Sequence, residues 1–188
     1  MEILKSFFAA SGFTESEVLQ LVDAFHLKVF SKGDFFVKEG KINSHLGFIE
    51  KGLLQYYVLI DGEEKTTYTT GENNFVVSLI SFFKEVPALE NIRAVTDAKV
   101  WMVEKNKFRQ LQKDIPSFKD FYINLLEWQI CCIEESRLTA ITLNAQERYQ
   151  KMLEKEPELV QQIPGQYLAS ILGVTPRHLS RIRSQVRN

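Results

Sequence analysis

The sequence predicts an α+β chain in which a β-rich first half is followed by helices. Glycine-containing turns recur at intervals of about ten residues between positions 33 and 72, which is typical of a sandwich or a double-sheet jelly roll. Residues 116–140 then carry apolar side chains at helical spacing. Residues 166–185 have the pattern of two short helices joined by a tight turn.

Charge is distributed unevenly along the chain. The 188 residues have a formal net charge of −1, and 45% of them are hydrophobic, enough for a packed core. Residues 142–188 carry seven Lys and Arg against four Glu, so the remainder is acidic. A basic end on an acidic body is typical of a nucleic-acid-binding unit attached to another domain.

Membrane, secretory and metal-binding signals are weak. No apolar run approaches the roughly 20 residues of a membrane span, and the N-terminus lacks the pattern of a signal peptide. The two cysteines, Cys131 and Cys132, are adjacent, so neither a disulfide framework nor a zinc site is indicated. We therefore expect a cytoplasmic protein with no membrane contact and no bound metal.

The first half is expected to begin with two short helices, over residues 3–10 and 14–25. Thr14 and Glu17 have the spacing of a capping box. Strands follow from His26, and Asp61-Gly62 is the strongest hairpin signal among them. A short helix is expected over 79–83, further strands over 91–103 and another short helix over 105–113.

Pro116 opens the longest predicted helix, which runs to about residue 140. It carries two apolar stripes, so it needs two partners. We expect one partner to be the β domain and the other to be the same helix of a second copy; the alternative is a helix buried entirely in its own monomer. The stripe assigned to the dimer interface consists of Phe118, Phe121, Leu125, Trp128 and Cys132, and the second stripe of Tyr122, Leu126, Ile130 and Ile133.

A helix over 145–154, capped by Asn144 or Thr142, leads to the C-terminal pair. In that pair, Gly173 sits where a left-handed C-cap is expected, Thr175 can cap the second helix, and Pro176 takes its first position. The spacing of Leu179, Ile182 and Val186 predicts the buried stripe of the second helix.

The opposite face of that second helix is basic. It presents Arg177, Arg181, Ser184 and Asn188, flanked by Arg183 and Arg187 and bordered by His178. Guanidinium groups in a major groove can donate two hydrogen bonds to guanine, so we interpret the pair as a helix-turn-helix. The alternative is an ordinary helical hairpin with a solvated basic face. The candidate DNA-binding residues are Gln166 and Thr175 for phosphate, Arg177, His178 and Arg181 for bases, and Arg183 and Ser184 beside them.

Taken together, the chain resembles the CRP/FNR superfamily of bacterial transcription regulators along essentially its whole length. The resemblance rests on the glycine-punctuated β segment, on 145–149 (AQERY), and on a set of C-terminal motifs: Ile163-Pro164, Leu168-Ala169, Leu172-Gly173-Val174-Thr175 and Leu179-Ser180-Arg181. It implies a cyclic-nucleotide-binding-like double-stranded β-helix (jelly roll) over 1–115, a dimerisation helix over 116–140 and a helix-turn-helix domain over 141–188. We expect a reduced wing, because only residues 159–163 remain to form a short strand.

The nucleotide site of this family is not matched. Its cyclic-AMP-binding members carry a Gly-Glu pair and then an Arg-Ser pair, whereas this chain has Val77-Ser78 and Ala88-Leu89 at the corresponding positions. A buried phosphate without a cationic partner is costly. We therefore expect that cyclic AMP is not the effector. Either an unknown small-molecule effector binds a pocket lined by Phe75, Ser78, Leu79 and Arg93, or the pocket is vestigial.

The leading hypothesis is a homodimeric transcription regulator, not an enzyme, with double-stranded DNA and RNA polymerase as its partners. A second hypothesis is a small-ligand sensor that acts through protein–protein contacts without binding DNA. A third, a cupin-type enzyme, lacks the clustered histidines that its metal site requires, because His26, His45 and His178 are spread over the chain.

Overall fold

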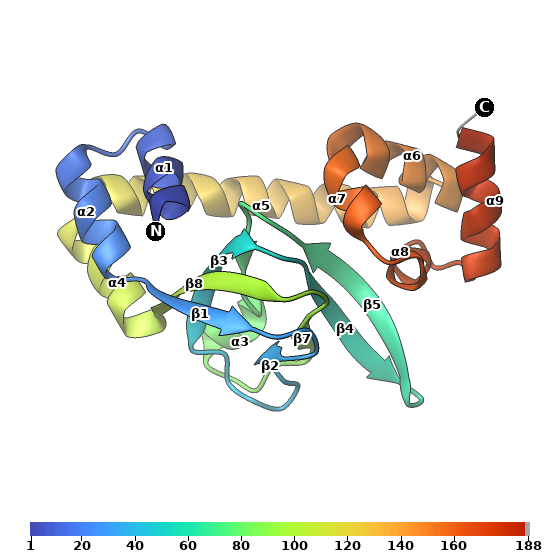
Figure 1. The fold of residues 1–188 in the computed structure, drawn as a ribbon, viewed down its shortest axis with the longest axis horizontal. Helices are drawn as coiled ribbons and strands as arrows, with labels where there is room; N and C mark the ends of the chain where they lie inside the picture. Colours follow the sequence, from blue (N-terminus) through green and yellow to red (C-terminus); the bar gives the residue numbers. More distant parts are fainter. Residues whose placement is uncertain (187–188) are drawn as a thin grey trace.

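The computed structural model describes residues 1–186; Arg187 and Asn188 lie outside the described residues. The chain begins with two short helices, α1 (Glu2–Ala10) and α2 (Glu15–Asp23), and continues into a β-roll beneath a long helix (Figure 1). Thr14 and Glu17 form the predicted capping box at the start of α2. The helices of residues 145–186, which form the C-terminal unit, lie together toward one end of the roll.

The roll consists of two four-stranded antiparallel sheets. One has the order β1-β8-β3-β6 and the other β2-β7-β4-β5. Each strand of the first half pairs with its counterpart in the second half, β1 with β8, β2 with β7, β3 with β6 and β4 with β5, as in one long hairpin that has been wound up. The strands are β1 (His26–Phe30), β2 (Phe35–Val37), β3 (His45–Lys51), β4 (Leu54–Ile60), β5 (Glu63–Thr70), β6 (Phe75–Val76), β7 (Asn91–Ala94) and β8 (Ala98–Glu104). The sequence prediction of a double-sheet β-roll is therefore confirmed.

The interior of the roll is filled by apolar side chains from both sheets. Alternate residues point inward, so Leu54 and Tyr56 of β4 are buried between the sheets while Gln55 and Tyr57 lie on the outer face. The buried cluster consists of Phe30, Val37, Ile49, Leu54, Tyr56, Val76, Ala88, Ile92, Ala94, Ala98, Val100 and Met102. Gly47 belongs to the same interior, because a Cβ there would stand 2.5 Å from Cγ1 of Val100.

A second core joins the N-terminal helices to the outside of the roll. Aromatic rings dominate it, and Phe7 packs on both Phe48 of β3 and Phe75 of β6. The short helix α3 (Leu79–Lys84) and helix α4 (Lys105–Asp114) border this region. Lys105 is buried beside Phe82, where its ammonium group donates to the carbonyl oxygens of Phe82 and Phe83 and pairs with Glu85 at 2.7 Å. This cation therefore closes the C-terminal end of α3.

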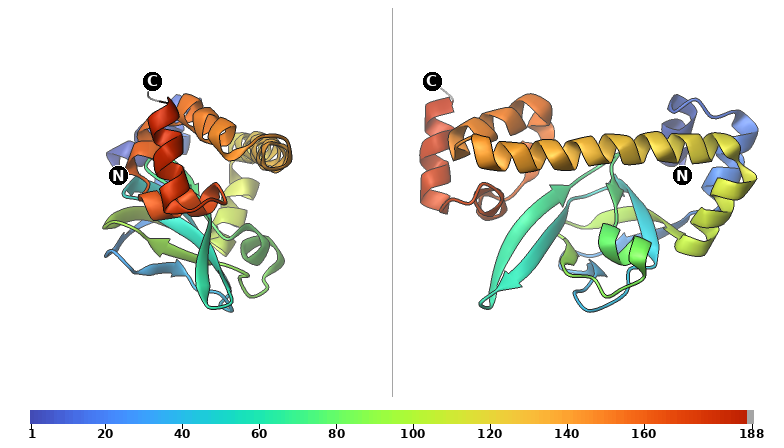
Figure 2. Two further views of the ribbon diagram at one scale, coloured as in Figure 1. Left: turned by 90° about the vertical axis from the view of Figure 1, so that its right-hand side faces the viewer. Right: turned by 180° about the vertical axis from the view of Figure 1, so that it is seen from behind.

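Helix α5 (Pro116–Thr142) runs across the top of the roll and connects it to the C-terminal unit (Figure 2). That unit contains α6 (Ala145–Lys155), α7 (Pro157–Gln162), α8 (Gly165–Ile171) and α9 (Pro176–Val186). Asn144 caps α6, with Glu147 completing a capping box. Within residues 1–186, no helix is long and apolar enough to cross a membrane.

The prediction of a short strand over residues 159–163 is wrong. This segment forms most of α7 instead, because Pro157 occupies the first helical turn and Glu158 follows it there. Val160 and Ile163 point into a core that they share with α8 and α9. Residues 141–186 accordingly contain helices and no strand.

Candidate nucleic-acid interface

The turn between α8 and α9 is fixed by backbone hydrogen bonds. Gly173 has φ +66°, a left-handed conformation that glycine adopts without strain. Its N–H donates to the carbonyl of Ser170 at 3.0 Å, and the N–H of Val174 donates to the carbonyl of Ala169 at 2.9 Å. This is the Schellman arrangement, and it ends α8 so that the chain can turn into α9.

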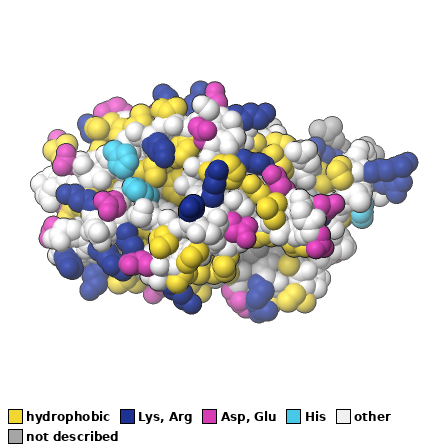
Figure 3. Space-filling view, turned by 90° about the horizontal axis from the view of Figure 1, so that it is seen from below, with side chains coloured by type: hydrophobic (Ala, Val, Ile, Leu, Met, Phe, Trp, Pro, Cys, Tyr) yellow, Lys and Arg dark blue, Asp and Glu magenta, His cyan; other side chains and the backbone are white. Residues whose placement is uncertain are grey.

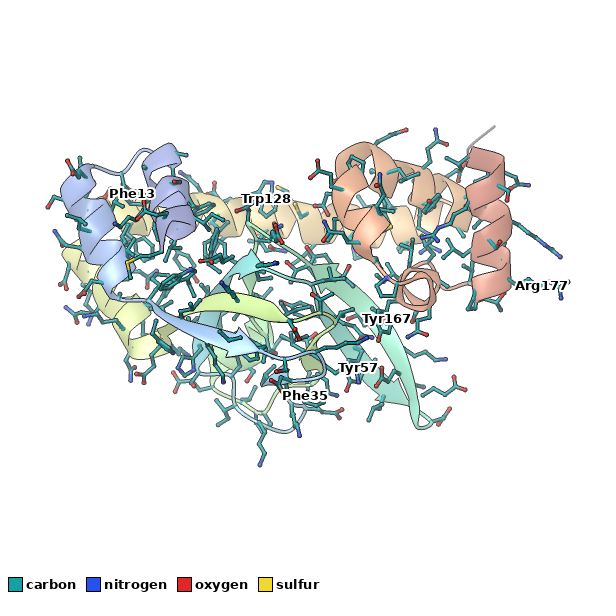
Figure 4. The ribbon with its side chains drawn as sticks, in the orientation of Figure 1. Phe13, Phe35, Tyr57, Trp128, Tyr167 and Arg177 are labelled. Carbon is teal, nitrogen blue, oxygen red and sulfur yellow. The ribbon has the colours of Figure 1, made fainter. Side chains whose placement is uncertain are left out.

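Helix α9 has one buried and one exposed face. Leu179 and Ile182 are 2% and 1% exposed, and they pack in one cluster with Leu168 and Leu172. Arg177 and Arg181 are exposed. Figure 4 shows Arg177 pointing away from the body, and Figure 3 shows Lys and Arg side chains projecting at the end formed by α9. Burial of the apolar stripe thus directs the guanidinium groups into solvent.

The other predicted residues on this face are also accessible. Gln166, Thr175, His178 and Ser184 are exposed, and Arg183 is half-buried. Thr175 caps α9, because its hydroxyl oxygen accepts from the N–H of His178 at 3.2 Å. Arg187 and Asn188, which the sequence analysis added to the same face, lie outside the described residues.

Arg148 of α6 supports this helix pair, and the sequence analysis assigned it no role. One of its terminal nitrogens donates to the carbonyl of Leu172 at 2.6 Å, at the C-terminal end of α8. A cation there complements the helix dipole and satisfies a carbonyl that the helix leaves free. Its Nε is buried without a hydrogen-bond partner among the described residues. The position of Arg148 depends on how α6 packs on α8, which local sequence patterns do not reveal.

The stripe on α5 that was assigned to a second copy is partly covered by its own chain. Phe118 is buried and Phe121 is half-buried, and both pack on Phe13 of the same chain. Leu125 and Cys132 are also half-buried, and Trp128 is the exposed member, at 59%. Tyr122 of the other predicted stripe packs on Phe108, so both stripes contact their own chain near the start of α5. Periodicity does not show which face a neighbour covers.

The face of α5 that remains open carries isoleucines. Ile130 and Ile141 are 64% and 72% exposed, and Ile123 is exposed as well. Ile130 and Ile141 follow Ile123 after about two and five helical turns, so the three lie along one line. Leu126 and Ile133 flank them, with Leu126 half-buried. This isoleucine stripe is an apolar surface without a partner in the described part of the chain.

The four residues predicted to line an effector pocket do not converge on one cavity, which corrects that prediction. Phe75 points out of the roll and packs on Phe7 and Phe48. Arg93 lies on the outer face of the other sheet, where it pairs with Glu64 at 2.6 Å. Ser78 is buried and Leu79 half-buried at the start of α3. The pleat of β6 and β7 places Val76 and Ile92 inward and leaves Phe75 and Arg93 outside.

The charge nearest to Ser78 is negative. Its hydroxyl donates to Glu90 at 3.1 Å, and burial raises the pKa of the Glu90 carboxyl above its usual value although this hydrogen bond opposes the shift. Ala88 is buried among the apolar residues of the roll and Leu89 is exposed. Within residues 1–186, the charged group beside the region where the family resemblance would place a phosphate is therefore a carboxylate and not a guanidinium.

Comparison with known proteins identifies the β-roll as similar to a known domain family. Residues 27–114 match the family model described as the cyclic nucleotide-binding domain. A cGMP-dependent protein kinase from Plasmodium berghei is 24% identical over 109 residues, which are 58% of this chain and 12% of the kinase. The chain thus spans only about an eighth of that relative's length.

Solved structures of CRP/FNR-type regulators have the same fold over nearly the whole chain. FixK2 from Bradyrhizobium japonicum has a TM-score of 0.72 at 16% identity, over 87% of this chain and 84% of that one. The c-di-GMP responsive regulator CLP from Xanthomonas campestris has a TM-score of 0.70 at 16% identity, over 93% of this chain and 92% of that one. The Thermus thermophilus catabolite activator protein has a TM-score of 0.58 at 19% identity, over 94% of this chain and 84% of that one. The β-roll and long helix therefore form a CRP-like fold.

We predict that Arg148→Met lowers the free energy of unfolding by roughly 1–3 kcal/mol, because it removes a charged hydrogen bond and a favourable helix-dipole contact. Urea unfolding followed by circular dichroism measures the change as a lower midpoint at an unchanged slope. Gln150→Met, at an exposed position of the same helix, is the matched control. Equal midpoints for the two variants would show that the Leu172 carbonyl does not depend on Arg148.

Proposed function

We propose that this chain is a homodimeric, sequence-specific DNA-binding regulator of transcription of the CRP/FNR type, which acts by binding and not by catalysis. The observation that carries the proposal is the two-sided α9, whose buried Leu179 and Ile182 turn Arg177 and Arg181 outward at the end of the molecule. A helix with exposed arginines on a rigid support fits the major groove, where arginine reads guanine. RNA polymerase is the proposed downstream partner.

The second copy is proposed to lie against the isoleucine stripe of α5. An exposed apolar line of this length is unusual on a monomer and fits a two-stranded coiled-coil contact. Helix α5 ends beside the C-terminal unit, so parallel pairing along it would bring two copies of α9 to the same end of the dimer (Figure 1). Two recognition helices about 34 Å apart would then meet successive major grooves on one side of the duplex.

The regulator is proposed not to respond to cyclic AMP. The roll interior is filled by aromatic and aliphatic side chains, and Glu90 would repel a phosphate placed beside Ser78. We predict that calorimetry detects no binding of cyclic AMP up to about 1 mM. A dissociation constant above that concentration means a binding free energy weaker than about 4 kcal/mol. Micromolar binding would contradict this part of the proposal.

We predict that Arg181→Ala costs ~1–3 kcal/mol of DNA binding and relaxes the preference at one base pair, because a bidentate contact to a base is lost. The measurement is fluorescence anisotropy at fixed salt, with sites selected from a random DNA pool. Lys119→Ala, which removes an exposed cation at the opposite end of α5, is the control.

Two results of this experiment would count against the base-reading role. An Arg181→Ala variant that keeps the wild-type ranking of sites would show that Arg181 contacts phosphate only. A wild-type chain without salt-dependent DNA affinity would contradict the whole proposal and favour the protein-docking sensor, since phosphate contacts make affinity fall steeply with salt.

We predict that Ile130→Glu weakens dimerisation at least ~100-fold, because each interface would bury two unpaired carboxylates. Sedimentation equilibrium measures the dissociation constant. Ile60→Glu places the same charge on another exposed isoleucine, at the β4–β5 hairpin, and should leave the dimer intact. A wild-type monomer, or an unchanged Ile130→Glu dimer, would exclude this stripe as the interface.

A further inference from the structure

The C-terminal unit is packed onto the roll through an apolar contact. Leu53 and Val95 of the roll belong to the same buried cluster as Leu168 and Ala169 of α8. Leu159 of α7 approaches the roll backbone so closely that a Cβ on Gly71 would stand 3.1 Å from its Cδ1. The unit is therefore docked on the roll and not merely tethered by α5.

A strand edge lies at the centre of this contact. Strand β5 is the last strand of its sheet, so one side of its backbone has no neighbouring strand. The pairing of β4 with β5 shifts register between Tyr56 and Tyr57, which leaves Thr67 as an extra residue. Beside this bulge, the N–H of Thr66 donates to the hydroxyl oxygen of Ser170 in α8 at 2.8 Å. The first helix of the α8–α9 pair thus covers the open edge of the sheet.

A chain of polar side chains supports the same point from within the sheet. Gln55 is fully buried, and its amide donates to the hydroxyl of Thr66 at 2.8 Å. Its carbonyl oxygen accepts from Arg93 at 3.0 Å. Arg93 in turn forms two hydrogen bonds with Glu64, at 2.9 and 2.6 Å, and lies over the ring of Tyr57 at 4.8 Å. Each member fixes the orientation of the next, so Thr66 is held rigidly where Ser170 meets it.

The helical unit is also attached to α5. Glu135 pairs with Lys151 of α6 at 2.6 Å and with Lys155, and hydrogen bonds from these ammonium groups lower the pKa of the Glu135 carboxyl to about 2. Figure 4 shows Tyr57 and Tyr167 in the region where β4 and α8 face each other. One attachment lies on α5 and the other on the sheet edge, and two attachments at different places restrict rotation of the unit.

We propose that Ser170, held by Thr66 and the chain of Gln55, Arg93 and Glu64, positions the α8–α9 pair for DNA binding. The sheet-edge contact sets the direction of the arginine face. Because α9 follows α8 through the Schellman turn and packs on it through Leu179 and Ile182, any tilt of α8 is transmitted to Arg177 and Arg181. This inference rests on the DNA-binding function proposed above.

The test compares Ser170→Ala, the conservative Ser170→Thr and a remote control, Ser16→Ala on the exposed surface of α2. Hydrogen exchange of the 188-residue chain reports on the contact without DNA. We expect the Thr66 amide to exchange about tenfold faster in Ser170→Ala, because it loses its acceptor, and at the wild-type rate in the other two. DNA affinity should fall about fivefold in Ser170→Ala alone, because a change of this size corresponds to the net contribution of one hydrogen bond.

The outcomes separate this inference from the proposed function. Unchanged exchange at Thr66 in Ser170→Ala would overturn the contact itself, whether or not the chain binds DNA. Faster exchange with wild-type DNA affinity would overturn the positioning role while leaving DNA binding intact. An Arg93→Met variant repeats the test from the other end of the hydrogen-bonded side chains and should also accelerate exchange at Thr66. Wild-type exchange in Arg93→Met would show that Arg93 and Glu64 do not help to hold Thr66.

Discussion

The burial of two side chains on α9 determines which side chains of the C-terminal unit are exposed to a partner. Leu179 and Ile182 are enclosed by Leu168, Leu172 and their neighbours, and the turn at Gly173 allows the two helices to meet at this point. Because a helix has two sides, fixing the apolar stripe inward fixes Arg177 and Arg181 outward. The long helix and the roll then act as the support that carries this basic face to the end of the molecule.

The roll has the fold of a cyclic nucleotide-binding domain but not the charged residues that the family resemblance would place beside a phosphate. The nested pairing of eight strands gives the architecture of a cyclic nucleotide-binding domain, and residues 27–114 match that family. Its interior is nevertheless occupied by Phe30, Tyr56 and Met102, and the polar pair at its edge is Ser78 with Glu90. A shape that depends on strand pairing and packing does not depend on the residues that would hold a phosphate. The outer face of the same roll, at the edge of β5, carries the polar contacts to α8.

Features encoded by local chemistry were predictable from the sequence. The capping box at Thr14, the hairpin at Asp61-Gly62, the turn at Gly173 and the stripe of α9 each depend on residues within one or two turns of each other. Features that depend on distant neighbours were not. The stripe of α5 that faces the roll, the outward side chain of Arg93 and the role of Arg148 follow from tertiary packing. Ser170 meets Thr66 across more than a hundred positions, and no local pattern marks that contact.

The proposed function requires two outward-facing copies of α9 to contact one DNA duplex. A hydroxyl-radical footprint on a site selected from random DNA tests it most directly. We expect two protected segments on the same side of the duplex, centred about 34 Å apart in a near-palindromic sequence. A single protected segment, two segments on opposite sides, or no selected site at all would contradict it.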